Sequence, residues 1–142
     1  MRYLKTYNES IKHLLKPKSD ENILKELEKL SDYDRIIKII KYNLPYELLP
    51  DNLTVNGDLK CSYNQLTKLP DNLTVQGSLD CSSNQLTKLP DNLTVNGYLY
   101  CSYNQLTELP DNLTVKGDLY CSYNQLPKNT KKPKGVKGKV YL

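Results

Sequence analysis

The stretch LPDNLTVNGDLKCSYNQLTK, residues 49–68, decides the fold because it returns almost unchanged at 69–88, 89–108 and 109–128. A unit that recurs in tandem at a fixed period cannot bury its apolar side alone, so successive copies must stack on one another. The sequence therefore predicts a solenoid over residues 49–128, with one coil per repeat.

Within each repeat, apolar and polar residues alternate over a short segment. In the first copy Leu59 and Cys61 alternate with polar neighbours, which predicts a strand with one buried face and one face in water. In-register copies are expected to pair in parallel. Asn56-Gly57 is a strong hairpin signal and indicates a tight turn into this strand. If residues 53–55 also pair from coil to coil, a second, shorter sheet lies on the convex side.

One asparagine recurs in every repeat, three residues after the cysteine. We expect these side chains to stack inside the coils, where amides can satisfy backbone groups that sheet pairing leaves free. The four residues are Asn64, Asn84, Asn104 and Asn124.

The four cysteines also recur every twenty residues, as Cys61, Cys81, Cys101 and Cys121. Side chains in such a column point the same way, which is poor geometry for a disulfide. A line of thiols cannot converge tetrahedrally on zinc. We therefore expect buried, reduced cysteines, no metal and no cofactor, and this pattern favours a reducing, cytoplasmic compartment.

Leu59, Cys61, Asn64 and Leu66 fall on the spacing L-x-C-x-x-N-x-L, which resembles the core of the leucine-rich repeat. The twenty-residue unit with flanking Leu-Pro is similar to the short bacterial class found in the IpaH ubiquitin ligases. Cysteine replaces one motif leucine, and Asn56 replaces another. The resemblance implies an α+β protein: a leucine-rich-repeat solenoid with a parallel β-sheet on the concave face and an N-terminal helical cap. The ligase domain of those proteins has no counterpart here.

Three parts are expected along the chain: a helical cap at 1–48, four repeats at 49–128 and a basic segment at 129–142. Apolar spacing predicts three helices: the first over residues 4–16, the second from Ser19-Asp20-Glu21 to about residue 30, and the third from residue 31 onward. The helical layer would cover the open first coil. Residues 137–142 resemble residues 116–121 with one residue inserted before them, which predicts a fifth strand that closes the far end.

The first thirty residues are similar to N-terminal segments of proteins from large tailed phages, some of which act as capsid-targeting sequences. The resemblance implies a phage-encoded protein in the host cytoplasm. It leaves open a structural or packaged virion protein targeted through its first helix. No apolar run long enough for a membrane span and no secretory signal pattern are found in the sequence.

Charge is unevenly distributed along the chain. Residues 49–126 carry four basic and eight acidic residues, whereas residues 127–142 carry six lysines and no acidic residue. A basic tail can contact nucleic acid, and lysines can also guard a terminal strand against edge-to-edge pairing. The sequence leaves both interpretations open.

Positions that differ between copies are free for function, and the clearest differences lie on the outward positions of the predicted strand. Tyrosines gather there in the third and fourth repeats, and tyrosine suits a protein interface. The alternative is that tyrosine only favours strands. We expect a monomer that binds a partner protein through this face. The candidate residues are Tyr98, Tyr100, Tyr120, Tyr103, Tyr123, Lys60 and Asp80.

Catalysis is not expected. The single histidine, His13, lies on the first predicted helix. The acidic residues are scattered over turns, and no glycine-rich phosphate loop occurs.

Overall fold

A computed structural model describes Lys25, residues 29–30 and 34–36, Ile39 and residues 52–142. The chain divides into two compact units, Met1–Pro50 and Asp51–Leu142. The second unit holds every strand of the described residues and is the part on which the functional argument rests.

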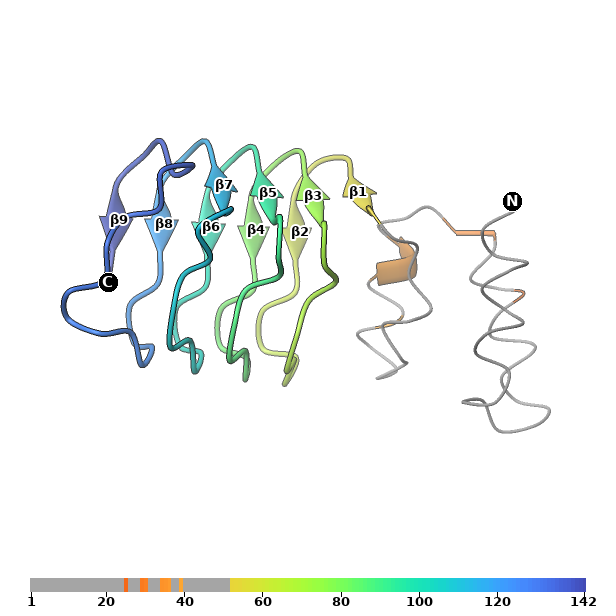
Figure 1. Ribbon diagram of the computed structural model, residues 1–142. Helices are drawn as coiled ribbons and strands as arrows, with labels where there is room; N and C mark the ends of the chain where they lie inside the picture. Colours follow the sequence, from red (N-terminus) through yellow and green to blue (C-terminus); the bar gives the residue numbers. More distant parts are fainter. Residues whose placement is uncertain (1–24, 26–28, 31–33, 37–38, 40–51) are drawn as a thin grey trace. The chain divides into compact units, whose positions relative to one another are not determined.

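The second unit is a parallel-strand β-solenoid of about four turns (Figure 1). Two sheets run along it, and in Figure 1 their arrows point in opposite directions. The first sheet contains β1 (Thr54–Val55), β3 (Thr74–Val75), β5 (Thr94–Val95) and β7 (Thr114–Val115). The second contains β2 (Leu59–Lys60), β4 (Leu79–Asp80), β6 (Leu99–Tyr100), β8 (Leu119–Tyr120) and β9 (Val140–Tyr141).

Within each sheet, every strand residue of one repeat pairs with the residue twenty positions later in the next repeat. Val55 lies opposite Val75 in the first sheet, and Leu59 lies opposite Leu79 in the second. Backbone hydrogen bonds join each coil to the next; for example, the Leu79 N–H donates to the Tyr98 carbonyl at 2.9 Å. The prediction of a parallel sheet is confirmed by the second sheet, and the additional sheet expected around residues 53–55 is the first sheet, which includes residues 54–55.

The predicted fifth strand is also confirmed. β9 pairs with β8, with Leu119 opposite Val140 and Tyr120 opposite Tyr141. The one-residue insertion is absorbed before Val136, which forms an isolated parallel bridge with Val115. The basic segment therefore adds a strand to the second sheet and a single bridging residue beside the first.

Columns of leucine, valine and cysteine form the interior, because the same inward position recurs in every coil. Leu79, Val75 and Cys81 have no exposed surface. All four cysteines are buried and free, as expected for an interior thiol column. Burial of these rows against the coils on either side is the main stabilising contribution to the array.

The asparagine column lies inside the coils at Asn84 and Asn104, is half-buried at Asn124, and has one exception to the predicted position. Asn84 Nδ2 donates to the carbonyls of Cys81 in its own coil and Cys61 in the preceding one, at 2.9 and 3.0 Å. Its Oδ1 accepts the N–H groups of Asn64 and Leu66. Asn104 and Asn124 repeat this arrangement, and their backbone partners are Leu86, Leu106, Cys81, Cys101 and Cys121.

The exception is Asn64, which is exposed and whose side chain donates only to Ser62 within its own coil among the described contacts. The prediction that it is interior is wrong. The bridging bonds of the other three asparagines reach back to a preceding repeat, and Asn64 belongs to the first.

A glycine column forms the corner between the two sheets. The N–H of Gly97 donates to the carbonyl of Gly77 at 2.9 Å, and Gly117 bonds to Gly97 in the same way. A Cβ on Gly97 would stand 2.8 Å from the Ser78 backbone nitrogen. Coils thus approach too closely here for any side chain. The Asn-Gly pair forms this corner, and no hairpin, because the two strands it joins belong to different sheets.

A second turn follows the strands of the second sheet. The residue just before each column asparagine has a left-handed backbone, with φ of 54–58° at Tyr63, Ser83, Tyr103 and Tyr123. Such a conformation is uncommon for residues other than glycine. Between this turn and the glycine corner, each strand is limited to two residues.

In the first unit, Lys25, residues 34–36 and Ile39 are helical. These positions agree with the second and third predicted helices, and Ile36 and Ile39 are buried as the apolar stripe required. The predicted helix over 4–16 lies outside the described residues.

Candidate binding surface

Four tyrosines form a continuous row on the outward side of the second sheet, and we call them the tyrosine ladder: Tyr98, Tyr100, Tyr120 and Tyr141. The rings of Tyr100 and Tyr120 stack with centroids 5.0 Å apart, and those of Tyr120 and Tyr141 at 4.7 Å. Tyr98 lies against Tyr100 at 6.2 Å with a tilt of 45°. Strand alternation explains the row, because Leu99 and Cys101 on either side of Tyr100 point inward.

Tyr103 and Tyr123 form a separate group, the tyrosine pair, at the left-handed turn. Their rings stack at 4.4 Å. No ring contact joins the pair to the ladder among the described residues. The five tyrosines singled out in the sequence therefore form two clusters, and both members of the pair are exposed, Tyr103 by 56% and Tyr123 by 71%.

Lys60 and Asp80 occupy the same outward column as Tyr100, in the first two coils. Lys60 lies opposite Asp80, which lies opposite Tyr100. Asp80 Oδ1 accepts the N–H of Ser82 at 3.1 Å, which gives this carboxylate a local structural role. The column thus begins with two charged side chains and continues with three tyrosine rings.

A second outward column, two residues earlier, shows where Tyr98 departs from the repeat. Asp58 Oδ1 accepts the N–H of Ser78 at 2.7 Å, and Asp118 Oδ1 accepts the N–H of Lys139 at 2.7 Å. Ser78 Oγ likewise accepts the N–H of Tyr98. Tyr98 has no oxygen near its backbone with which to continue this chain of caps. Its side chain instead places a ring beside Tyr100.

The phenol of Tyr120 stays protonated well into the alkaline range. Partial burial, followed by the nearby Asp118 carboxylate, raises its pKa. Burial and the Tyr123 phenol do the same to the pKa of Tyr103. Both hydroxyl groups are therefore hydrogen-bond donors at neutral pH.

The cysteines of the thiol column lack the accessible, readily ionised thiol of a reactive cysteine site. Burial, with a smaller contribution from Asp80, raises the pKa of Cys61 to about 12, and burial also raises the pKa of Cys81. A hydrogen bond with Cys121 and then burial raise the pKa of Cys101, and the same bond lowers that of Cys121. All four sulfur atoms lie out of reach of a substrate because their side chains are buried.

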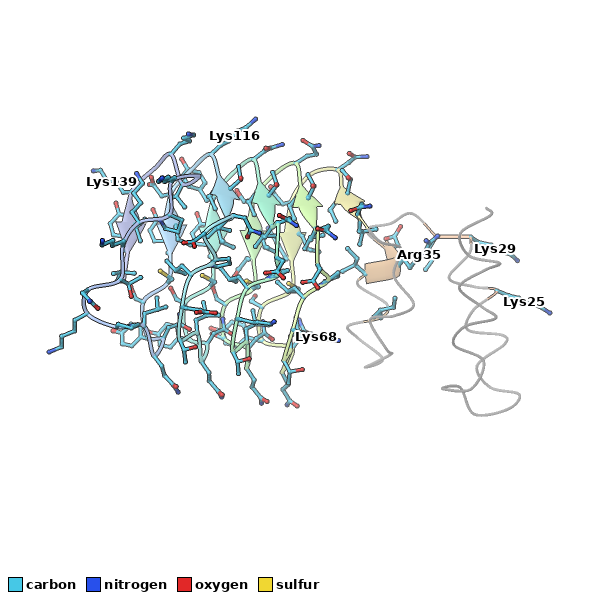
Figure 2. The ribbon with its side chains drawn as sticks, viewed as in Figure 1. Lys25, Lys29, Arg35, Lys68, Lys116 and Lys139 are labelled. Carbon is cyan, nitrogen blue, oxygen red and sulfur yellow. The ribbon has the colours of Figure 1, made fainter. Side chains whose placement is uncertain are left out.

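The basic segment lies at the end of the ladder. Its five lysines and the neighbouring Lys128 are all exposed: Lys128, Lys131, Lys132, Lys134, Lys137 and Lys139. Figure 2 labels Lys139 beside β9 and Lys116 at the corner of the preceding coil. Lys132 Nζ donates to the Gly138 carbonyl at 2.6 Å, which holds the loop against the approach to β9.

Tyr141 is a member of the ladder that the sequence reasoning did not single out. The alignment of residues 137–142 with 116–121 already placed it in the position of Tyr120, so the signal was present in the sequence. β9 carries it into the ladder as the last ring.

Neither models of protein families, nor curated proteins, nor solved structures gave a match to this chain. Within the described residues, no helix is both long and apolar enough to cross a membrane. In the same residues, no group of three or more histidine, cysteine or acidic side chains could hold a metal ion.

Proposed function

We propose that this chain is a small leucine-rich-repeat protein that binds a partner protein through the outward face of its second sheet. The repeat-family assignment is supported by the asparagine column, whose amides bridge successive coils at the spacing of the motif. The helical segment before the repeats is proposed as the cap of the first coil, and catalysis forms no part of the function.

The observation that carries the binding function is Tyr98. Repetition supplies an internal control, because the residues equivalent to Tyr98 occupy the same place in the other three coils. Asp58, Ser78 and Asp118 all cap the backbone of the next coil. Tyr98 gives up that stabilising bond and extends an aromatic surface instead. Such a loss within the array is expected where a surface serves binding.

The composition of the surface supports a protein partner. Tyr98, Tyr100 and Tyr141 are 46%, 37% and 41% exposed while remaining in contact with other rings. Mutual stacking fixes their positions, so that little side-chain freedom is lost on binding. Ordered tyrosines with hydroxyl ends at the surface are typical anchors of protein interfaces.

The proposal is tested by affinity capture with the intact chain and by measuring the affinity of the captured protein for purified variants. Tyr100→Ala with Tyr120→Ala should weaken binding about thirtyfold, as loss of interface anchors does. The matched control is Thr94→Ala with Thr114→Ala, since these residues are also paired on adjacent strands but lie in the other sheet. Equal affinity of the tyrosine variant and the control would contradict the proposal.

Two alternatives are separated by the same experiment. A variant changed at Lys131, Lys132 and Lys134 that alone loses its partner would favour contact through the basic segment, including nucleic acid. A chain lacking residues 1–18 that alone loses its partner would favour a virion protein targeted by its N-terminus; those residues lie outside the described part of the chain.

A further inference from the structure

The tyrosine ladder and the basic segment form one surface. β9 places Tyr141 in the column of Tyr120 and places Lys139, two residues before it, opposite Asp118. Alternation along the strand puts both Lys139 and Tyr141 on the outward side, with Val140 between them. A partner that reaches the last rings of the ladder therefore also meets lysine.

Stacking determines which parts of the rings a partner can touch. Tyr100, Tyr120 and Tyr141 are nearly parallel, with interplanar angles of 11° and 6°. The faces of Tyr120 are covered by Tyr100 and Tyr141, so its edge and hydroxyl group are the parts left at the surface, whereas Tyr141, the last ring, has a stacked partner on one face only among the described residues. Ring edges carry partial positive charge, whereas ring faces carry partial negative charge.

The hydroxyl groups add donors to these positive edges. Burial and the Asp118 carboxylate raise the pKa of Tyr120, so its phenol keeps its proton. Asp118 places one carboxylate beside Tyr120, and its Oδ1 accepts the backbone N–H of Lys139. The exposed Lys137 and Lys139 outnumber this carboxylate, so toward β9 the surface offers hydrogen-bond donors and net positive charge.

On these grounds we infer that the partner presents an extended acidic segment, whose carboxylates meet Lys139 and the hydroxyl edges of the tyrosine ladder. This inference rests on the proposed binding function and names the chemistry of the partner. Single-stranded nucleic acid binds such proteins by stacking successive bases on open aromatic faces; the ladder is less suited to it, because both faces of Tyr120 are covered by rings and, in the described part of the chain, Tyr141 has only its outer face without a ring partner.

The length of the segment follows from the sheet. The four spacings between five strands, about 4.8 Å each, cover about 19 Å, which corresponds to about six residues of extended chain at about 3.3 Å per residue. A peptide of about eight residues spans the five strands with about one residue to spare at each end. A fluorescein-labelled peptide of eight glutamates is therefore the first probe. A glutamine peptide and an oligothymidylate of the same number of units serve as comparison probes.

Fluorescence anisotropy with the full chain should show saturable binding of the glutamate peptide, weaker binding of the glutamine peptide and a loss of affinity with salt. Lys139→Glu should weaken binding about fivefold or more, because a favourable surface charge becomes an unfavourable one. Lys88→Glu is the matched control, since Lys88 is an exposed lysine outside both sheets. Tyr120→Phe tests the hydroxyl group while keeping the stacked ring, and it should also weaken binding.

Three results would overturn the inference: no saturable binding of the glutamate peptide, equal losses for Lys139→Glu and Lys88→Glu, or tighter binding of the oligothymidylate. The failure of the inference can be told apart from the failure of the proposed function. If the captured protein partner still requires Tyr100 and Tyr120 while the glutamate peptide does not bind, the function stands and the acidic chemistry is wrong.

Discussion

At the scale of single residues, the interior asparagines contribute to stability through bonds to the backbone of two coils. Asn84 forms hydrogen bonds with backbone groups of two coils, and it is only 8% exposed. Removing the amide leaves several buried backbone groups without a partner, each at a cost of about 1–3 kcal/mol. Sequence position in the array sets this role, since the same residue type at position 64 is exposed.

Asn84→Ala should lower the free energy of unfolding by about 3 kcal/mol or more, because its amide serves more than one buried group. Asn64→Ala is the control and should cost about 1 kcal/mol or less, since one exposed bond is lost. Urea unfolding of both variants measures the difference. Equal losses would mean that the asparagine column does not bridge the coils.

At the scale of the turns, two different constraints select glycine at the corner between the sheets. Within the array the backbone of the neighbouring coil leaves no room for a Cβ, whereas in the first coil the residue has a positive φ. Gly57 has a φ of 98° and open space where a Cβ would stand, whereas Gly97 is crowded by the Ser78 backbone. Gly97→Ala should therefore lower the free energy of unfolding by about 2 kcal/mol, as overpacking does. Gly57→Ala should cost about 1 kcal/mol through its backbone conformation alone. Thermal or urea unfolding separates the two, and the reverse order would contradict crowding between coils.

The left-handed turn offers a change that should stabilise the protein. Ser83 interrupts a column that otherwise contains Tyr63, Tyr103 and Tyr123, and all four residues share nearly the same φ. Ser83→Tyr should add ring stacking of the kind seen between Tyr103 and Tyr123 at 4.4 Å. We expect a gain of about 1 kcal/mol in the free energy of unfolding. Ser83→Ala, which adds no ring, should show no gain. A destabilised Ser83→Tyr protein would show that the column cannot hold another ring.

At the scale of the whole molecule, the thiol column makes stability depend on pH. Burial raises the pKa of Cys61 from 9.0 to about 12, so above pH 9 the unfolded chain loses a proton that the folded chain retains. Stability from this group is complete below pH 9 and falls as pH rises toward 12. Cys81 and Cys101 act in the same direction, and Cys121, whose pKa is lowered, acts in the opposite one.

Cys61→Ala isolates one member of the column. Between about pH 9.5 and 11 the free energy of unfolding of the original chain should fall more steeply than that of the variant, by about 1.4 kcal/mol per pH unit. Groups that do not interact with Cys61 contribute alike to both proteins and cancel in the difference. Urea unfolding at several pH values measures the two slopes, and parallel slopes would show that Cys61 ionises as freely in the fold as outside it.

The repeat made most of the solenoid predictable. Alternation around Leu59 and the fixed spacing of Asn84 set the strands and the interior amides, and the offset match of residues 137–142 set β9. The left-handed turns could not be predicted, because Tyr and Ser carry no intrinsic preference for that conformation and adopt it to aim the following asparagine inward. The ring contacts depend on the directions in which the tyrosine side chains leave the backbone, and residue spacing does not specify these directions. The sequence therefore did not show that Tyr103 and Tyr100 belong to separate clusters.

The stacked tyrosines also make the protein its own optical probe. The chain has twelve tyrosines and no tryptophan or phenylalanine, so tyrosine accounts for its near-ultraviolet aromatic spectrum. Nearly parallel rings 4.7–5.0 Å apart run from Tyr100 to Tyr141, and those of Tyr103 and Tyr123 lie 4.4 Å apart. Coupling of their electronic transitions gives a circular-dichroism signal that isolated tyrosines lack. That signal disappears when the third, fourth and final coils separate, even while the first coils stay paired. Fraying of the array from its C-terminal end can thus be followed in solution without any attached label.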